Sequence, residues 1–285
     1  MNFHRGWLVV LLLCCTNFSS ISIGSSSIEQ CIKPSLLEAD CSNQTTCHHR
    51  SYYTYFRRYY PSPYLSKVMP GELEEVHGRR ATFGMGCFWA GDSLFGALPG
   101  VIRTSVGYAG GQKESPTYRD MGDHTEVVNI EYDPNLISYL QLLDLFWKNH
   151  EYGLTTKIKT QYMSLILYHN EEQKTTAEKS LNDMQRKRGE TFATEIRRFD
   201  KFYPAEDYHQ KYRLQNHPWL IESTGLTGGE ILRSSPLAAK LNGYIAGAGT
   251  IEQLEKDLPR MGLSEKAGQY LKKYAIENQG NGLYC

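Results

Sequence analysis

The chain has 285 residues, enough for one large domain or two small ones. Its 31 lysines and arginines balance its 31 aspartates and glutamates. This even charge gives no indication of a nucleic acid or an anionic surface as the partner. The seven cysteines carry more information, because their positions bear on both the redox compartment and the chemistry.

Residues 1–24 have the features of a secretory signal peptide. Arg5 precedes an apolar run over residues 7–15, which is too short to span a bilayer as a stable helix. Ser22-Ile23-Gly24 has the small-x-small pattern of an acceptable cleavage site. A glycosylation sequon at residues 43–45 supports the same route. We expect a secreted or luminal protein with no membrane span in the mature chain; the alternative is an uncleaved anchor.

Residues 25–78 predict an extension without a core of its own. No helical or strand period persists in this serine-, cysteine- and tyrosine-rich segment, which indicates a flexible or loosely pinned chain. Cys41 and Cys47 lie close to His48 and His49 and could form a metal site. In a secreted chain a disulfide is the better interpretation, and we expect no bound metal or cofactor.

The first sharp signal is a strand followed by a glycine and a cysteine. A strand-like run at residues 80–83 leads into Gly86, which permits a tight turn, and Cys87. The apolar positions from Ala90 to Leu98 then have helical spacing. Cys87 is therefore predicted on the first turn of a short helix, where the dipole favours a thiolate. The alternative is a buried structural cysteine.

The rest of the chain predicts alternating strands and helices around one sheet, an α+β fold. Strands are predicted over 101–108, 126–132, 162–168 and 194–199. Helices are predicted after Ser138 with Leu140, Leu143, Phe146 and Trp147 on one face, over 171–188, and from Pro204 to Leu214. Residues 216–285 are predicted to be mostly helical, with helices at 236–246, 250–258 and 264–277.

Three polar side chains join Cys87 as candidates for chemistry. By strand alternation, Glu126 shares a face with Val128 and should point into the interior, where burial keeps a carboxyl protonated. The alternative is a glutamate on a partly wet sheet edge. Tyr118 lies in a turn-rich loop before this strand, and Tyr162 begins the third strand. Together these residues supply a thiolate, a neutral acid and phenolic donors.

An ordered series of motifs resembles the class A peptide methionine sulfoxide reductases, which act on the S-epimer. The resemblance covers residues 79–215 and implies a ferredoxin-like α/β plait. The motifs are Gly86-Cys87-Phe88-Trp89, Gly107-Tyr108-Ala109-Gly110-Gly111, Pro116-Thr117-Tyr118-Arg119, Gly122-Asp123-His124-Thr125-Glu126, Tyr132-Asp133-Pro134, Phe146-Trp147, Asn149-His150, Thr160-Gln161-Tyr162 and Tyr203-Pro204-Ala205-Glu206-Asp207-Tyr208-His209-Gln210.

The resemblance implies a thiol-dependent reduction that repairs oxidised methionine. Cys87 would attack the sulfoxide sulfur, release methionine and become a sulfenic acid. Glu126 would protonate the sulfoxide oxygen, and Tyr118 and Tyr162 would hold that oxygen. No bound cofactor is implied, and thioredoxin or another thiol would supply electrons.

Four further residues complete the implied site. Phe88 and Trp89 would form the apolar wall that receives the methyl group. Glu151 stands where an aspartate is common, so its supporting role is open. Cys285 is the only cysteine downstream of Cys87 and is assigned as the resolving thiol. The alternative for Cys285 is a stable disulfide to the N-terminal extension.

Two other functions are compatible with the sequence. One is a cysteine hydrolase that pairs Cys87 with His124 or His209, although no spacing selects either histidine. The other is a secreted, non-enzymatic binding or effector protein on the same scaffold. We expect a monomer with a signal peptide, an N-terminal extension, a catalytic domain over 79–215 and a helical extension over 216–285.

Overall fold

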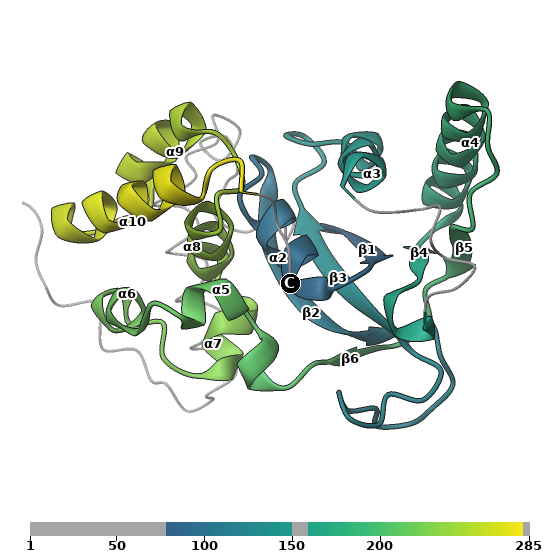
Figure 1. Ribbon diagram of the computed structural model, residues 1–285, viewed down its shortest axis with the longest axis horizontal. Coiled ribbons are helices and arrows are strands. Elements are labelled where there is room, and N and C mark those ends of the chain that lie inside the picture. The colour runs from purple at the N-terminus through teal and green to yellow at the C-terminus, as the bar shows by residue number, and fades with distance from the viewer. Residues whose placement is uncertain (1–77, 150–158, 282–285) are drawn as a thin grey trace, which may run out of the picture. The chain divides into compact units, whose positions relative to one another are not determined.

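The computed structural model describes residues 78–149 and 159–281, and these belong to one compact unit. Within them, one six-stranded sheet has the order β5-β4-β1-β3-β2-β6 (Figure 1). The strands are β1 (Arg79–Met85), β2 (Val101–Ala109), β3 (Thr125–Tyr132), β4 (Ser164–Tyr168), β5 (Glu195–Arg198) and β6 (Phe202–Pro204). All neighbouring strands pair antiparallel except β4 and β5, which are parallel. The predicted α+β class with a mixed sheet is confirmed.

Helices connect and follow the strands within the described residues. In the part before residue 216 they are α2 (Phe88–Gly96), α3 (Tyr139–Lys148), η2 (Thr160–Tyr162), α4 (Glu171–Arg188), η3 (Asp207–His209) and α5 (Tyr212–Gln215). After it they are α6 (Pro218–Thr224), α7 (Gly229–Ser234), α8 (Pro236–Ile245), α9 (Ile251–Asp257), η4 (Leu258–Arg260) and α10 (Glu265–Asn278). Along residues 78–149 and 159–281, no helix combines the length and the hydropathy that a membrane span requires.

The main core lies between one face of the sheet and the helices α2, α3 and α4. Phe83 of β1 is fully buried and packs against Phe95 of α2 and Phe146 of α3, with ring centroids 5.7 and 5.2 Å apart. Trp147 and Ala177 extend this core to α4. The same side of the sheet carries the start of α2, so the packing that holds the core also holds the segment that contains Cys87.

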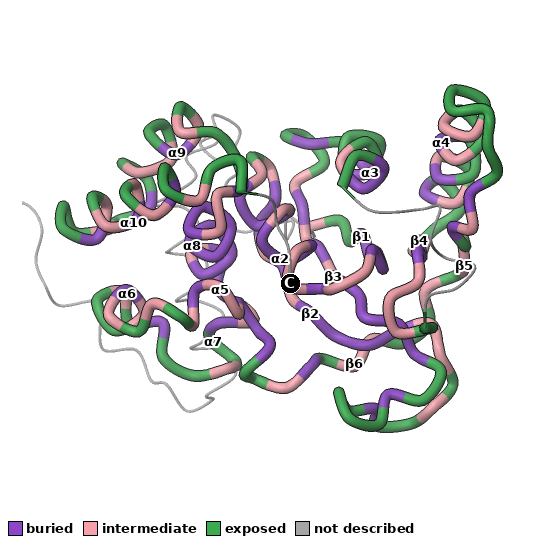
Figure 2. Tube along the Cα trace, viewed as in Figure 1, coloured by how far each residue is buried: buried purple, intermediate pink, exposed green. Residues whose placement is uncertain are grey.

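The helices after residue 216 enclose a second apolar cluster. It includes Leu220, Leu241, Leu254 and Leu271, all fully buried. Among these helices, α8 is buried along most of its length, as Figure 2 shows. It packs against α2, so this cluster adjoins the part of the chain that carries Cys87.

The turn before Cys87 depends on glycine. Gly86 has φ +87°, a left-handed conformation that L-residues rarely adopt. Cys87 follows in an extended conformation as the N-cap of α2, and the helix proper begins at Phe88. Cys87 therefore lies one residue before the first turn of α2. The sequence pattern predicted it within that turn.

Three details differ from the sequence predictions. Tyr162 ends the short helix η2 and β4 begins only at Ser164, because the amides of Tyr162 and Met163 bond back to Lys159 and Thr160. Pro204 ends the edge strand β6, where its missing N–H costs no ladder hydrogen bond, and does not begin a helix. Leu140 is 48% exposed, because Tyr139, Leu142 and Leu143 occupy the inner face of α3.

The glycine at the turn can be tested with a matched pair of variants. Gly86 and Gly189, the C-cap of α4, both have positive φ, and a Cβ added at either would meet nothing within 4 Å. Gly86→Ala and Gly189→Ala should each lower the free energy of unfolding by about 1–2 kcal/mol, measured in urea. Only Gly86→Ala should also slow alkylation of Cys87 in the reduced protein. An equal slowing in Gly189→Ala would contradict a local role for the turn.

Candidate active site

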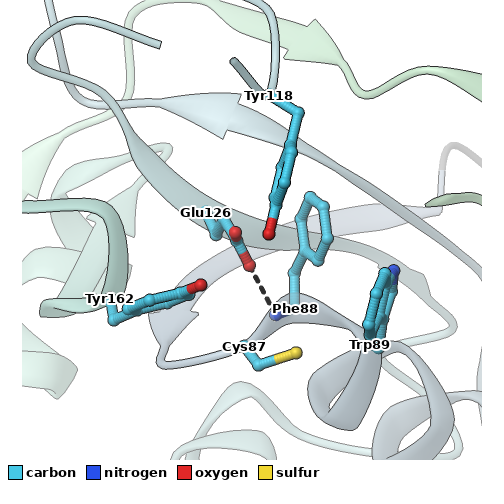
Figure 3. Close-up of a pocket in the computed structure, with 6 residues that line it drawn as sticks. All are labelled: Cys87, Phe88, Trp89, Tyr118, Glu126 and Tyr162. Atoms are coloured by element: carbon cyan, nitrogen blue, oxygen red, sulfur yellow. Dashed lines mark hydrogen bonds between the residues drawn. The ribbon is translucent and has the colours of Figure 1, made fainter. Parts of the chain in front are cut away.

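Six of the predicted residues line one pocket of about 400 Å³. They come from the start of α2, the loop before β3, β3 itself and η2, and they are Cys87, Phe88, Trp89, Tyr118, Glu126 and Tyr162 (Figure 3). The structure therefore brings together side chains that are far apart in the sequence. Glu151 and Cys285 lie outside the described residues, so their predicted roles remain predictions.

Cys87 is half-buried at the N-terminal end of α2, where backbone amides and the helix dipole favour a negative charge. It is disulfide-bonded in this structure. Its partner lies outside the described residues, because these contain no other cysteine. Its position at the N-terminus of α2 agrees with a redox-active cysteine.

Glu126 is the buried acid of the pocket, with 1% of its surface exposed. As predicted, it lies on the same face of β3 as Val128, which is fully buried. Its two carboxylate oxygens accept hydrogen bonds from the Phe88 amide at 3.1 Å and from the Gln161 side chain at 2.7 Å. Burial raises its pKa above the usual carboxyl range, against the opposing effect of these two bonds. The carboxyl can thus hold a proton at a higher pH than an exposed glutamate.

The two tyrosines place phenolic oxygens beside this carboxyl (Figure 3). Burial, the neighbouring charge of Glu126 and a hydrogen bond with Tyr118 raise the pKa of Tyr162 to about 12. Tyr162 therefore stays protonated near neutral pH and can donate a hydrogen bond. The Tyr118 amide donates to Glu206 at 3.0 Å, and Glu206 also accepts from the Tyr108 hydroxyl at 2.7 Å. These bonds anchor the loop that carries Tyr118.

Aromatic rings form the opposite wall. Phe88 is buried, and Trp89 stacks on Tyr212 of α5 with ring centroids 3.7 Å apart and planes 6° apart. His209 packs edge-on against Phe88 at 5.1 Å and lies 5.6 Å from Trp89. This wall is mainly aromatic, so it suits a small apolar group beside the sulfur.

The structure does not support a histidine base for a cysteine hydrolase. His124 uses both ring nitrogens in its own loop: one accepts from the Gly111 amide at 3.1 Å, and the other lies 2.7 Å from the Lys113 carbonyl. Burial lowers the pKa of His209, and within the described residues neither of its ring nitrogens has a hydrogen-bond partner. A general base in a triad needs a third group to orient it, and no described group orients His209.

Gln161 and Glu206 complete the site, although we assigned neither a role from the sequence. Gln161 fixes the acid, and Glu206 fixes the loop of Tyr118. Each lies within one of the motifs that carry the family resemblance, next to or near a predicted residue, which is the signal that could have found them.

Across the described ranges, no group of three or more histidine, cysteine, aspartate or glutamate side chains could hold a metal ion. The cysteine and histidine pairs at Cys41, Cys47, His48 and His49 lie outside those ranges.

Comparison with known proteins points to one family. The family model described as "Peptide methionine sulfoxide reductase" matches residues 79–226. A peptide methionine sulfoxide reductase of Drosophila melanogaster is 57% identical over 219 residues, covering 76% of this chain and 89% of the relative. Peptide methionine sulfoxide reductase A5 of rice, Oryza sativa subsp. japonica, is 45% identical over 171 residues, covering 58% of this chain and 67% of the relative. MsrA of Methanococcus maripaludis strain C5 is 43% identical over 145 residues, covering 48% of this chain and 92% of the relative.

The raised pKa of Glu126 has a consequence for stability that Glu126→Gln can test. The buried carboxylate destabilises the folded state once the pH exceeds the carboxyl's unfolded pKa, and it costs nothing when protonated. Glu126→Gln should therefore raise the free energy of unfolding at pH 8 by on the order of 1 kcal/mol, and this gain should vanish below about pH 4. Denaturation in urea at both pH values measures the difference.

Glu131 in the same strand provides the control. It pairs with Arg103, with 2.7 Å between its carboxylate and the guanidinium Nε. Glu131→Gln should lose stability at pH 8 or leave it unchanged. A loss of stability in Glu126→Gln that grows with pH would contradict the assignment of a destabilising buried charge.

Proposed function

The chain belongs to the peptide methionine sulfoxide reductase family and reduces methionine sulfoxide, and we propose that the pocket around Cys87 performs this reaction on the S-epimer. The observation that carries the proposal is the placement of a buried, pKa-raised carboxyl, Glu126, against the start of the helix that Cys87 caps. A thiolate and a proton donor are the two groups that this reduction needs.

In the proposed first step, the Cys87 thiolate bonds to the sulfoxide sulfur while Glu126 gives a proton to the oxygen. The sulfoxide oxygen leaves poorly until it is protonated, so the acid has to act on it directly. The protonated oxygen then passes from the substrate sulfur to the Cys87 sulfur: the substrate sulfur–oxygen bond and the new sulfur–sulfur bond break, a Cys87 sulfur–oxygen bond forms, and methionine leaves with Cys87 as a sulfenic acid. The substrate sulfur is reduced by two electrons, and the cysteine sulfur is oxidised by two.

The other pocket residues orient the substrate. Protonated Tyr162, together with Tyr118, donates hydrogen bonds to the sulfoxide oxygen, where negative charge develops. Phe88 and Trp89 receive the methyl group on the apolar side. Polar donors on one side and an apolar wall on the other distinguish the oxygen from the methyl group, which supports selection of one epimer.

We propose that Cys285 resolves the sulfenic acid. Its thiol attacks the Cys87 sulfur, water leaves, and a Cys87–Cys285 disulfide forms. A dithiol such as thioredoxin would then return two electrons and regenerate both thiols. No bound cofactor takes part in this cycle. Glu151 would support the site from the segment that follows α3.

The order of strands and helices supports the predicted ferredoxin-like architecture. The four central strands have the order β4-β1-β3-β2, with α2 after β1 and α3 after β3, which supports a ferredoxin-like plait.

We propose a monomer with a catalytic domain over 79–215 followed by a helical extension. The signal-like residues 1–24 support a secreted or luminal location. A non-enzymatic role is not favoured, because the pocket retains the thiol, the carboxyl and the phenols that the proposed first step needs.

Reduction of racemic methionine sulfoxide tests the reaction and its stereochemistry. With dithiothreitol as reductant and a chiral column as the assay, the protein should consume the S-epimer and leave the R-epimer unchanged. Cys87→Ser should abolish this activity. Consumption of both epimers, or of neither by folded protein with a titratable Cys87, would contradict the proposal.

The role of Cys285 needs a different assay, with thioredoxin as the reductant. Cys285→Ser should form one methionine per protein in a single turnover and then stop, because the sulfenic acid cannot become a disulfide. Cys31→Ser in the N-terminal extension is the matched control and should turn over normally. Unchanged multiple turnover in Cys285→Ser would assign the resolving role to another thiol.

A further inference from the structure

A buried cluster of polar side chains lies where α2, β2, α5 and α8 meet. Its members are Asp92, Thr104, Lys211 and Asn242, each at most 1% exposed. We call these four residues the Asp92 cluster. Buried charges and amides are costly unless they are paired, so such a cluster persists only where its bonds are satisfied together.

Asp92, on the second turn of α2, is the centre of this cluster. One carboxylate oxygen accepts from the Thr104 hydroxyl at 2.5 Å and from the Lys211 ammonium at 3.0 Å. The other accepts from the Lys211 backbone amide at 3.2 Å and from the Asn242 side chain at 3.3 Å. Lys211 also donates to the Thr104 carbonyl at 2.8 Å. One carboxylate therefore holds α2 against β2 and against the residue that precedes α5.

Asn242, on α8, joins the two helices that this carboxylate holds. Its amide nitrogen donates to Asp92 and, at 3.2 Å, to the Ser93 hydroxyl, both on α2. Its oxygen accepts from the Leu214 amide at 3.0 Å. Leu214 lies in the first turn of α5, where amides have no partner within the helix. Asn242 thus bonds to α2 and α5 at once.

The backbones of α8 and α2 lie in close contact, so α8 is tightly packed on α2. A Cβ placed on Gly96 would lie 2.4 Å from the Ala239 carbonyl oxygen, and one on Gly243 would lie 2.5 Å from the Ala97 nitrogen. Lys240 of α8 donates to the Ala97 carbonyl at 3.2 Å, just beyond the end of α2. Yet α8 begins at Pro236, after the segment that the family model matches.

The helices α2 and α5 carry the two stacked rings of the pocket wall, Trp89 and Tyr212. Within the described part of the chain, the Trp89 indole nitrogen has no hydrogen-bond partner. The position of the indole therefore depends on ring packing, and the packing depends on where the two helices lie relative to each other. The bonds from Asn242 help to fix that relation, together with those from Lys211 to Asp92.

We propose that Asn242 is a positioning residue for substrate binding: a helix outside the matched family segment sets the aromatic wall that receives the methyl group. This inference rests on the proposed role of Trp89 in that wall. It assigns the helical extension a part in the affinity for methionine sulfoxide, while Cys87 keeps its place at the start of α2 and Glu126 keeps its place on β3.

The test is the steady-state kinetics of Asn242→Leu in the full chain, with dithiothreitol and methionine sulfoxide. This variant keeps the volume and removes the bonds to Asp92, Ser93 and Leu214. KM should rise about 5–10-fold. The single-turnover rate of methionine formation at saturating substrate should stay within about twofold of the wild-type rate. An unchanged KM, or a fall in the single-turnover rate alone, would overturn the proposal.

Ser180→Ala is the control for a general loss of stability. Ser180 accepts a buried hydrogen bond from the Trp147 indole at 2.7 Å between α3 and α4, away from the pocket. Its removal should lower the melting temperature and leave KM unchanged. If KM rose as much in Ser180→Ala as in Asn242→Leu, the rise in both variants would follow from lost stability. The positioning role of Asn242 would then be wrong.

Two further measurements keep the inference testable if Asn242→Leu does not fold. Asn242→Asp retains an acceptor for the Leu214 amide but sets a second carboxylate against Asp92, so KM should again rise.

In the wild-type protein, hydrogen exchange of residues 88–96, 212–215 and 236–245 should report one shared opening event. Independent opening of 236–245 would overturn the coupling. If the wild-type protein reduces neither epimer, the proposed function fails, and hydrogen exchange still decides the coupling.

Discussion

The hydrogen bond from the Phe88 amide to Glu126 is the interaction on which the site depends. It joins the first residue of α2, next to Cys87, to the buried face of β3. Because the amide at a helix N-terminus has no partner within the helix, the carboxylate completes the helix and the helix orients the carboxylate. The same first turn favours a thiolate at Cys87. The start of α2 thus holds Glu126 and Cys87, the proposed acid and nucleophile, beside each other without a long chain of intermediate contacts.

The proposed reaction needs a carboxyl that still holds its proton when the sulfoxide binds, and the raised pKa of Glu126 favours the protonated form. Glu126 lies beneath the pocket, where desolvation raises its pKa, while Gln161 and the Phe88 amide keep its oxygens oriented. Two hydrogen bonds are sufficient to fix the geometry without returning the pKa to its ordinary range. Burial acts on Tyr162 in the same direction, since it is the largest cause of the raised pKa of that phenol. The pocket therefore concentrates proton donors on one wall and leaves the other wall to aromatic rings.

Local patterns in the sequence predicted those parts of the site whose physics is local. Alternation along β3 placed Glu126 inward, and Gly86 marked the turn before Cys87. Tyr162 was placed at the start of a strand because its apolar neighbours alternate, yet backbone bonds of a 3₁₀ turn decide that position. Pro204 suits either a helix start or an edge strand, and only pairing with β2 selects the strand. Gln161 and Asn242 act on partners 35 and 150 residues away, so strand or helix periodicity does not reveal their roles; only its place in a family motif marks Gln161.

The buried polar groups link the stability of the helical extension to the stability of the helices that line the pocket. Asp92 and Lys211 form an ion pair that is 1% and 0% exposed at its side chains, and a pair removed from water is tolerated only when further hydrogen bonds satisfy it. Asn242 supplies one of those bonds from α8, while the glycines of α2 and α8 allow the two backbones to approach closely enough for it to form. Loss of α8 would expose this pair and the adjoining faces of α2 and α5 together. The wall of the pocket is built from those two helices, so the folding of the extension and the shape of the substrate site share one set of contacts.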